Sequence, residues 1–105
     1  MNIESLELML QQGQDNFLLR FGLAQAQLKN NNSSEAIVHI KKALEFDALH
    51  SSSWKLLGKA LAQEERHAEA IDAFEKGIKV AENQGDIQAA KEMKVFLKRS
   101  QKSLN

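Results

Sequence analysis

The chain has 105 residues, of which 43% are hydrophobic, and its 14 basic and 14 acidic residues give a net charge of zero. One folded domain is expected at this length, and the apolar content excludes a disordered chain. The absence of cysteine excludes disulfides and thiolate metal sites. Neutral charge argues against nucleic acid as a partner. No apolar run approaches the roughly 20 residues of a membrane span, and residues 1–5 lack the features of a signal peptide, so a cytoplasmic protein is expected.

Apolar residues recur at intervals of three and four along the whole chain, which predicts helices and no strands. We expect a short first helix, a second that runs to about Lys29, and a third that ends near Phe46. The fourth begins at about Trp54 and the fifth follows a tight turn at Glu64–His67. The predicted helices lie at about residues 3–12, 16–29, 34–46, 54–63, 68–82 and 87–99.

Short polar residues mark where these helices begin and end. Gly13 and the segment Asn83–Gly85 are predicted to stop helices, because glycine and asparagine tolerate left-handed backbone. Side-chain oxygens that accept the unpaired amides of a first turn make good N-caps. The predicted N-caps are Asp15, Ser33 or Ser34, a serine of the segment 51–53, and Asp86. The tail from about Ser100 is expected to fray.

Sliding the chain by 34 residues superimposes one helix pair on another. The equivalent positions carry similar residues, and a small residue in one copy usually meets a small residue in the other. Small residues at fixed places allow antiparallel helices to pack closely. The aligned pairs are Leu23 with Leu57, Ala24 with Gly58, Ala26 with Ala60, Glu35 with Glu69, Ala36 with Ala70, Ile37 with Ile71, Ile40 with Phe74, Lys42 with Lys76 and Ala43 with Gly77.

This period and pattern resemble the tetratricopeptide repeat family, over roughly residues 17–84. The second repeat matches strongly, with Trp54, Leu57, Gly58 and Leu61 in its first helix. The first repeat is degenerate, since Arg20 and Gln27 stand where the family has Trp and Tyr. Ala48 and Glu82 replace the proline that usually ends each repeat.

The resemblance implies an all-α, right-handed superhelix of about six antiparallel helices. Repeat arrays need covered ends, so the first and last helices are expected to cap the stack. The expected organisation is one domain over residues 1–105, with an N-terminal helix at 1–14, a degenerate repeat at 17–50, a second repeat at 51–84, and a capping helix and tail at 85–105.

In this family the first helix of each repeat lines a concave groove that binds a protein or peptide. Lys55 and Lys59, one helical turn apart, stand where carboxylate-clamp members bind a peptide's terminal carboxylate, and Phe21 and Leu28 would add an apolar floor. Ordinary solvated lysines would show the same spacing. The matching groove positions are Leu18, Phe21, Gln25, Leu28 and Lys29 in the first repeat and Ser52, Lys55, Lys59, Ala62 and Gln63 in the second.

The last segment, residues 85–105, holds five basic and two acidic residues. Its basic stripe, which we define as Lys91, Lys94, Lys98 and Lys102, recurs at helical spacing. Contact with an acidic partner, a nucleic acid or a membrane surface is one interpretation. A capping helix with a solvated face is the other, and we favour it because the apolar side is needed to cover the fifth helix.

No catalytic motif and no phosphate-binding loop is present, so neither enzymatic activity nor a cofactor is expected. The three histidines have no metal-site spacing, and His39 is expected on an outward helix face. The sequence therefore predicts a binding adaptor, as a monomer or weak homodimer, for a protein or peptide with an acidic group or a C-terminal carboxylate. The alternative is a self-associating structural subunit, joined through apolar residues such as Leu8, Leu49 and Val95.

Overall fold

The computed structural model describes residues 2–105, and over that range it consists of six α-helices joined by short connections, with no strand. The all-α prediction is therefore confirmed. The helices are α1 (Ile3–Gln11), α2 (Phe17–Lys29), α3 (Ser33–Phe46), α4 (Ser51–Gln63), α5 (His67–Asn83) and α6 (Ile87–Leu104).

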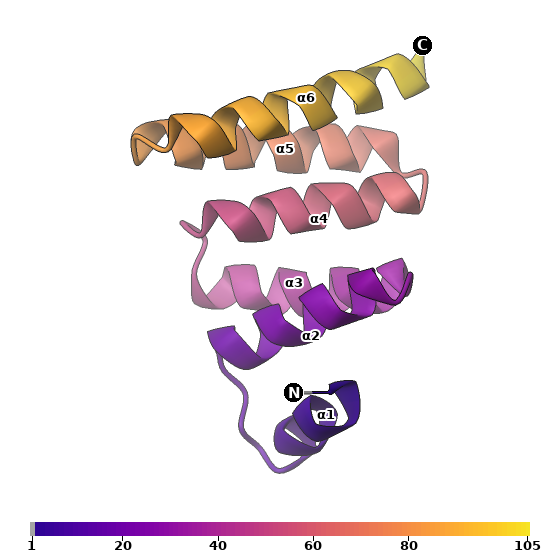
Figure 1. The fold of residues 1–105 in the computed structure, drawn as a ribbon, viewed down its shortest axis with the longest axis vertical. Coiled ribbons are helices and arrows are strands. Elements are labelled where there is room, and N and C mark those ends of the chain that lie inside the picture. The colour runs from indigo at the N-terminus through magenta and orange to yellow at the C-terminus, as the bar shows by residue number, and fades with distance from the viewer. Residues whose placement is uncertain (1) are drawn as a thin grey trace.

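The helices form a stack about 43 Å long, from α1 at one end to α6 at the other (Figure 1). Each helix packs against the next one along the chain, and α4 also contacts both α2 and α6. The helices α2, α4 and α6 are therefore neighbours in one layer, while α3 and α5 lie behind them (Figure 1). This arrangement gives the stack one face that is built from every second helix.

Close approach of the helices depends on the small residues of the repeat. Ala24, Ala36, Ala43 and Ala70 are all fully buried, with no exposed surface. A Cβ atom added at Gly58 would lie 2.6 Å from Cζ of Phe74, well inside van der Waals contact. The backbone of α4 at Gly58 thus contacts the Phe74 ring of α5 directly, and only glycine leaves room for this contact.

The first helix has a small apolar cluster of its own. Leu6 packs with Leu19 and Leu23 of α2, and Met9 and Leu10 lie against them. The main core, which contains Phe74 and Ile40, is a separate cluster that extends from α2 to α6. Since α1 contacts α2 and no other described helix, it covers the end of the stack, as a capping helix must.

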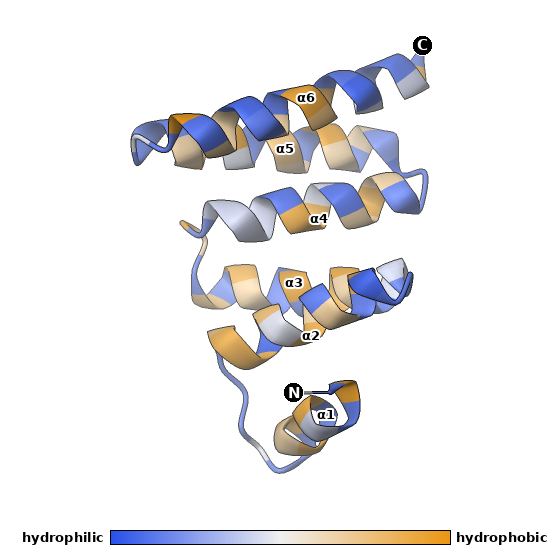
Figure 2. Cartoon of the chain, viewed as in Figure 1, coloured by the Kyte–Doolittle hydropathy of each residue, from blue (hydrophilic) through white to orange (hydrophobic). Residues whose placement is uncertain are grey.

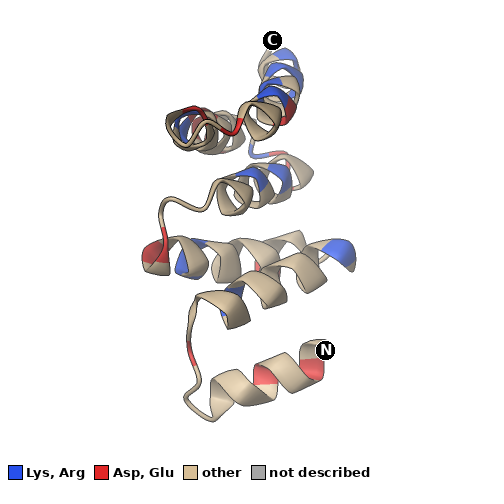
Figure 3. Cartoon of the chain, turned by 60° about the vertical axis from the view of Figure 1, so that its left-hand side comes forward, with Lys and Arg blue, Asp and Glu red and all other residues tan. Residues whose placement is uncertain are grey.

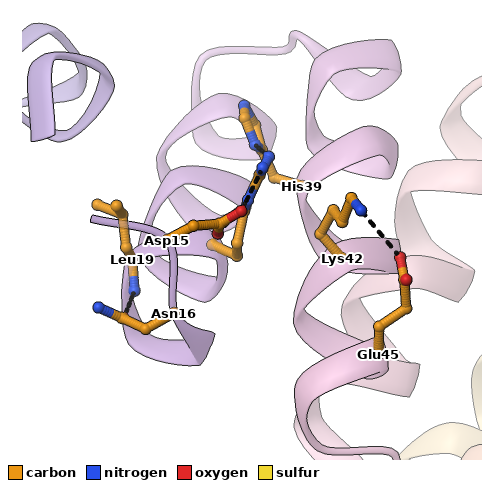
Figure 4. Close-up of polar contacts among 7 residues, drawn as sticks. Asp15, Asn16, Leu19, His39, Lys42 and Glu45 are labelled. Carbon is orange, nitrogen blue, oxygen red and sulfur yellow. Dashed lines mark hydrogen bonds and ion pairs between the residues drawn. The ribbon is translucent and has the colours of Figure 1, made fainter. Parts of the chain in front are cut away.

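Three of the predicted helix ends are confirmed. Gly13 and Gly85 adopt left-handed backbone, with φ of +86° and +74°, just past the ends of α1 and α5. Asp86 caps α6, since its carboxylate accepts the amide of Ala89 at 3.1 Å. The prediction of Asp15 as a cap was wrong. Asn16 caps α2 by accepting the amide of Leu19 at 2.9 Å, while Asp15 turns to Arg20 instead (Figure 4).

The serine caps were also wrong, because these serines are already inside their helices. Ser33 is the first residue of α3, after Asn32, and its hydroxyl donates to Glu64 at 3.0 Å. Ser53 lies in the first turn of α4 and its Oγ is 2.7 Å from Nδ1 of His50. In both cases the hydroxyl is hydrogen-bonded to a residue outside its own helix, and the sequence pattern does not predict that contact.

The tail does not fray at Ser100. Helix α6 continues to Leu104, and Ser100 is only 3% exposed. The physical reason is packing rather than propensity, because α6 lies along α5 and reaches α4 (Figure 1). Figure 2 shows α6 as largely hydrophilic with separate apolar bands, so its amphipathic face holds it on the stack.

Candidate binding groove

A groove of about 990 Å³ lies between α2, α4 and α6, and we call it the α2–α4–α6 groove. Its floor is apolar and aromatic, and its rim is polar and basic. Helices supply almost all of its walls, so the lining side chains are held on rigid elements. The lining residues are Phe21, Gln25, Leu28, Lys29, His50, Ser52, Lys55, Leu56, Lys59, Ala62, Gln63, Phe74, Phe96, Arg99 and Ser100.

The groove collects nine of the ten positions that the family resemblance pointed to. Phe21, Gln25, Leu28 and Lys29 come from α2, and the others, Ser52, Lys55, Lys59, Ala62 and Gln63, come from α4. They share one surface because positions three and four residues apart lie on the same side of a helix, and α2 and α4 are neighbours. That these side chains bind a partner stays a prediction.

Leu18 does not belong to this lining and is 78% exposed. Its neighbour Phe17 turns inward instead and packs against Phe21, with ring centroids 5.7 Å apart. His50 completes this end of the groove, since its ring meets those of Phe17 and Phe21 edge-on at 4.8 and 4.9 Å. Sequence reading missed His50 because it precedes α4 in a connection with no helical periodicity.

Helix α6 supplies a wall that the repeat pattern did not predict. Phe96 stacks on Phe74 with centroids 5.7 Å apart and planes inclined by 15°. Two cations lie near the Phe96 ring, with Nζ of Lys59 at 5.5 Å and Cζ of Arg99 at 5.4 Å from its centroid. Both distances are in the range of cation–π contact. The capping helix is thus also part of the groove.

Charge in the groove is of one sign. Its lining carries Lys29, Lys55, Lys59 and Arg99, and none of the lining residues in the described chain is acidic. Figure 3 shows basic residues on α4 and α6, while α1 carries acidic ones. Since the whole chain is neutral, the excess of cations is a local property of this surface and favours an anionic ligand.

The four cations differ in their own partners. Nζ of Lys55 lies 3.6 Å from a carboxylate oxygen of Glu92 on α6. Lys59 and Arg99 form no ion pair with any residue in the range 2–105. Lys29 of α2 also forms no ion pair in this range, so two of the three cations without an internal counter-ion, Lys59 and Arg99, lie where α4 and α6 meet.

A polar cluster outside the groove occupies the place of the family's tryptophan. Arg20 forms two hydrogen bonds to Asp15, at 2.8 and 2.9 Å, and its Nη1 lies 3.0 Å from Nδ1 of His39 (Figure 4). The hydrogen bonds from Arg20 lower the pKa of the Asp15 carboxyl. Burial, and then the charge of Arg20, lower the pKa of His39.

The prediction that His39 lies on an outward helix face was wrong, because its side chain is buried, with 8% of its surface exposed. A neutral imidazole accepts from the guanidinium, so Arg20 of α2 joins His39 of α3 to Asp15 in the connection between α1 and α2. Sequence reading could not foresee this contact, because Arg20 and His39 are 19 residues apart and lie on different helices.

The basic stripe of α6 lies on the solvent side. Lys94 is paired with Glu82 of α5 at 3.1 Å, and Lys91, Lys98 and Lys102 are exposed. None of the four lines the α2–α4–α6 groove. The stripe and the groove are therefore separate basic surfaces.

A second groove, of about 650 Å³, lies between α3 and α5 with α4 as its floor. We call it the α3–α5 groove. Its floor includes Trp54, Leu57 and Leu61, and its rim mixes Lys41 and Lys76 with three acidic residues, Glu45, Glu69 and Asp72. Unlike the first groove, it has no uniform charge.

Among residues 2–105, no group of three or more His, Asp or Glu side chains is arranged to hold a metal ion. No helix in the same range is long and apolar enough to cross a membrane. The site is thus defined by shape, an apolar floor and positive charge.

Antiparallel helix pairs that recur every 34 residues, with a groove along the layer of first helices, define a helical repeat protein. A family model described as tetratricopeptide repeat matches residues 51–84. The chain is also 46% identical, over 99 residues, to the TPR repeat-containing protein PA0015 of Pseudomonas aeruginosa, and the match covers 94% of each chain.

Solved structures agree with this match. The solution structure of protein BPP2914 from Bordetella parapertussis is 42% identical, with a TM-score of 0.83, and the match covers 95% of this chain and 87% of that one. A tetratricopeptide repeat domain protein from Salinibacter ruber is 28% identical, with a TM-score of 0.73, over 82% of this chain and 87% of that one. The chain therefore belongs to the tetratricopeptide repeat family, as its sequence pattern indicated.

Proposed function

We propose that this protein is an adaptor that holds a segment of a partner protein, or a peptide, in the α2–α4–α6 groove. The observation that carries the proposal is the combination of a preformed groove of about 990 Å³ with an apolar floor and a basic rim. Such concave, largely apolar sites with a few polar groups are where proteins bind their ligands. Membership of a repeat family whose folds serve protein interaction supports the same reading.

The chemistry of the rim indicates which segments fit. Lys29, Lys55, Lys59 and Arg99 attract carboxylates, and Phe21, Leu28 and Leu56 offer apolar surface beside them. An extended segment with acidic side chains, or a C-terminal carboxylate next to an apolar residue, satisfies both features. The proposed partner is therefore an acidic peptide segment, met in the cytoplasm.

Self-association is the alternative function. The exposed apolar residues that motivated it are Leu8, 53% exposed on α1, Leu49, 65% exposed between α3 and α4, and Val95, 50% exposed on α6. Helices α1 and α6 are at opposite ends of the stack (Figure 1), so the three residues come from separate parts of the stack. A symmetric dimer needs one patch that is complementary to itself, and we therefore prefer the adaptor.

Partner capture with matched charge-reversal variants tests the proposal. Wild type is compared with Lys55→Glu/Lys59→Glu, which reverses two charges in the groove, and with Lys41→Glu/Lys79→Glu, which makes the same charge change outside it. Partners are captured from bacterial lysate and identified by mass spectrometry. The proposal predicts a partner that the first variant loses and the second keeps. Equal capture by all three proteins would show that the α2–α4–α6 groove does not bind the partner, and would contradict the proposal.

A further inference from the structure

We infer that a carboxylate of the bound peptide is held between Lys59 of α4 and Arg99 of α6, beside the ring of Phe96, and not between Lys55 and Lys59. This inference rests on the proposed function, because it assigns the anion-binding position within the α2–α4–α6 groove. It makes Arg99 and Phe96, which lie outside both repeats, determinants of ligand specificity.

Lys55 already has an acidic partner on α6. Its ammonium group already faces the carboxylate of Glu92 at 3.6 Å, and its side chain is 30% exposed. A ligand carboxylate at this place would meet the negative charge of Glu92 as well as the positive charge of Lys55. The two effects oppose each other, so Lys55 is a weak position for an anion in this protein.

Lys59 and Arg99 lie near the same aromatic ring. Both cations lie within about 5.5 Å of the centroid of one ring, that of Phe96, and neither forms an ion pair with a described residue. No acidic side chain among the described residues offsets either charge, so a carboxylate that binds between them gains attraction to both. Arginine adds a planar fork of donors that matches a carboxylate.

Core packing holds the Phe96 ring in place. Phe96 is stacked on Phe74, which is 1% exposed in the core. The ring at which the two cations gather is therefore fixed by core packing, and the long side chains lose less freedom when a ligand arrives. Apolar surface from Phe96 next to the cations suits a peptide in which an apolar side chain neighbours the acidic one.

Selection from a phage-displayed library of random peptides tests the assignment without a known partner. Three proteins are compared: wild type, Lys59→Gln/Arg99→Gln, and the control Lys91→Gln/Lys98→Gln, which removes two exposed cations of α6 that do not line the groove. All four side chains lie on the surface, and circular dichroism verifies that each variant is folded. We expect peptides rich in Asp and Glu from wild type and from the control, and loss of that enrichment in Lys59→Gln/Arg99→Gln.

The possible results separate the inference from the proposed function. Selected peptides without acidic enrichment, or enrichment that only the control loses, would overturn the assignment to Lys59 and Arg99 but not peptide binding itself. Failure of wild type to select any peptide would contradict the proposed function itself. If light scattering shows that wild type is a dimer and that Lys59→Gln/Arg99→Gln is a monomer, the groove binds a second copy of the chain, and the inference is overturned.

Calorimetry with one selected peptide gives the magnitude. Replacement of its acidic residue by the corresponding amide should weaken binding to wild type about fivefold, the effect of one solvent-accessible charge contact. The same replacement should change binding to Lys59→Gln/Arg99→Gln by less than about twofold. An undiminished loss in that variant would place the carboxylate elsewhere. Arg99→Lys, which keeps the charge and loses the fork of donors, should show a preference between those of wild type and of Lys59→Gln/Arg99→Gln.

Discussion

The substitution Gly58→Ala examines the packing that shapes the groove. A Cβ atom at this position would lie 2.6 Å from Cζ and 2.7 Å from Cδ1 of Phe74. The Phe74 ring cannot easily retreat, because it is 1% exposed and is stacked on Phe96. Alanine therefore forces either the ring or α4 to shift, although alanine is the better helix former.

The magnitude follows from two opposing contributions. Overpacking of a tight core costs roughly 1–3 kcal/mol, and the upper end applies because the ring is held on both sides. The gain in helix propensity over glycine returns about 1 kcal/mol. The net loss in free energy of unfolding is about 2 kcal/mol, which lowers the melting temperature of a domain of this size by about 8–10 °C.

Gly22→Ala is the matched control on α2. An added Cβ there has its nearest neighbour at 3.8 Å, the Cδ1 atom of Leu6, which is ordinary contact. Only the propensity gain of about 1 kcal/mol remains, so this variant should melt about 4–5 °C above wild type. Thermal unfolding followed by circular dichroism measures both. A Gly58→Ala protein as stable as wild type would refute the close α4–α5 contact.

Two further predictions concern the N-terminal half. Burial and the charge of Arg20 lower the pKa of His39 in the folded protein, so the unfolded state binds more protons. The free energy of unfolding should therefore fall as pH drops through about 6.5, by at most about 1.4 kcal/mol per pH unit. Urea titrations of wild type and His39→Gln at several pH values check this, and identical pH profiles would contradict it. Leu6→Ala should accelerate amide hydrogen exchange across α1 and leave the exchange rates of α4–α6 unchanged, because α1 contacts only α2 among the described helices. A uniform acceleration would contradict this and show that α1 belongs to the main cooperative unit.

The fold was predictable because the informative residues act locally and repeat. Ala24, Gly58 and Gly77 are small for the same reason, close helix packing, and a period of 34 residues makes that reason visible in one sequence. The helix caps were less predictable. The carboxylate of Asp15 could accept either a backbone amide or the guanidinium of Arg20, and only the folded chain shows that it binds Arg20.

The groove was half predictable for a related reason. The family's motif positions specify which side chains of α2 and α4 face the groove, so the resemblance pointed to Phe21 and Lys59. Phe96 and Arg99 depend on how α6 crosses α4, and no repeat position encodes that crossing. The basic stripe of α6 drew attention in the sequence, yet the cation of α6 that lines the groove is Arg99 beside it.

Amide chemical shifts of isotope-labelled wild-type protein, recorded during titration with the most strongly selected peptide, test the central claim most directly. We expect the largest shift changes on α2, α4 and α6, with Phe21, Lys59 and Arg99 among the residues affected. Changes centred on the α3–α5 groove, around Leu44 and Ala73, would contradict it.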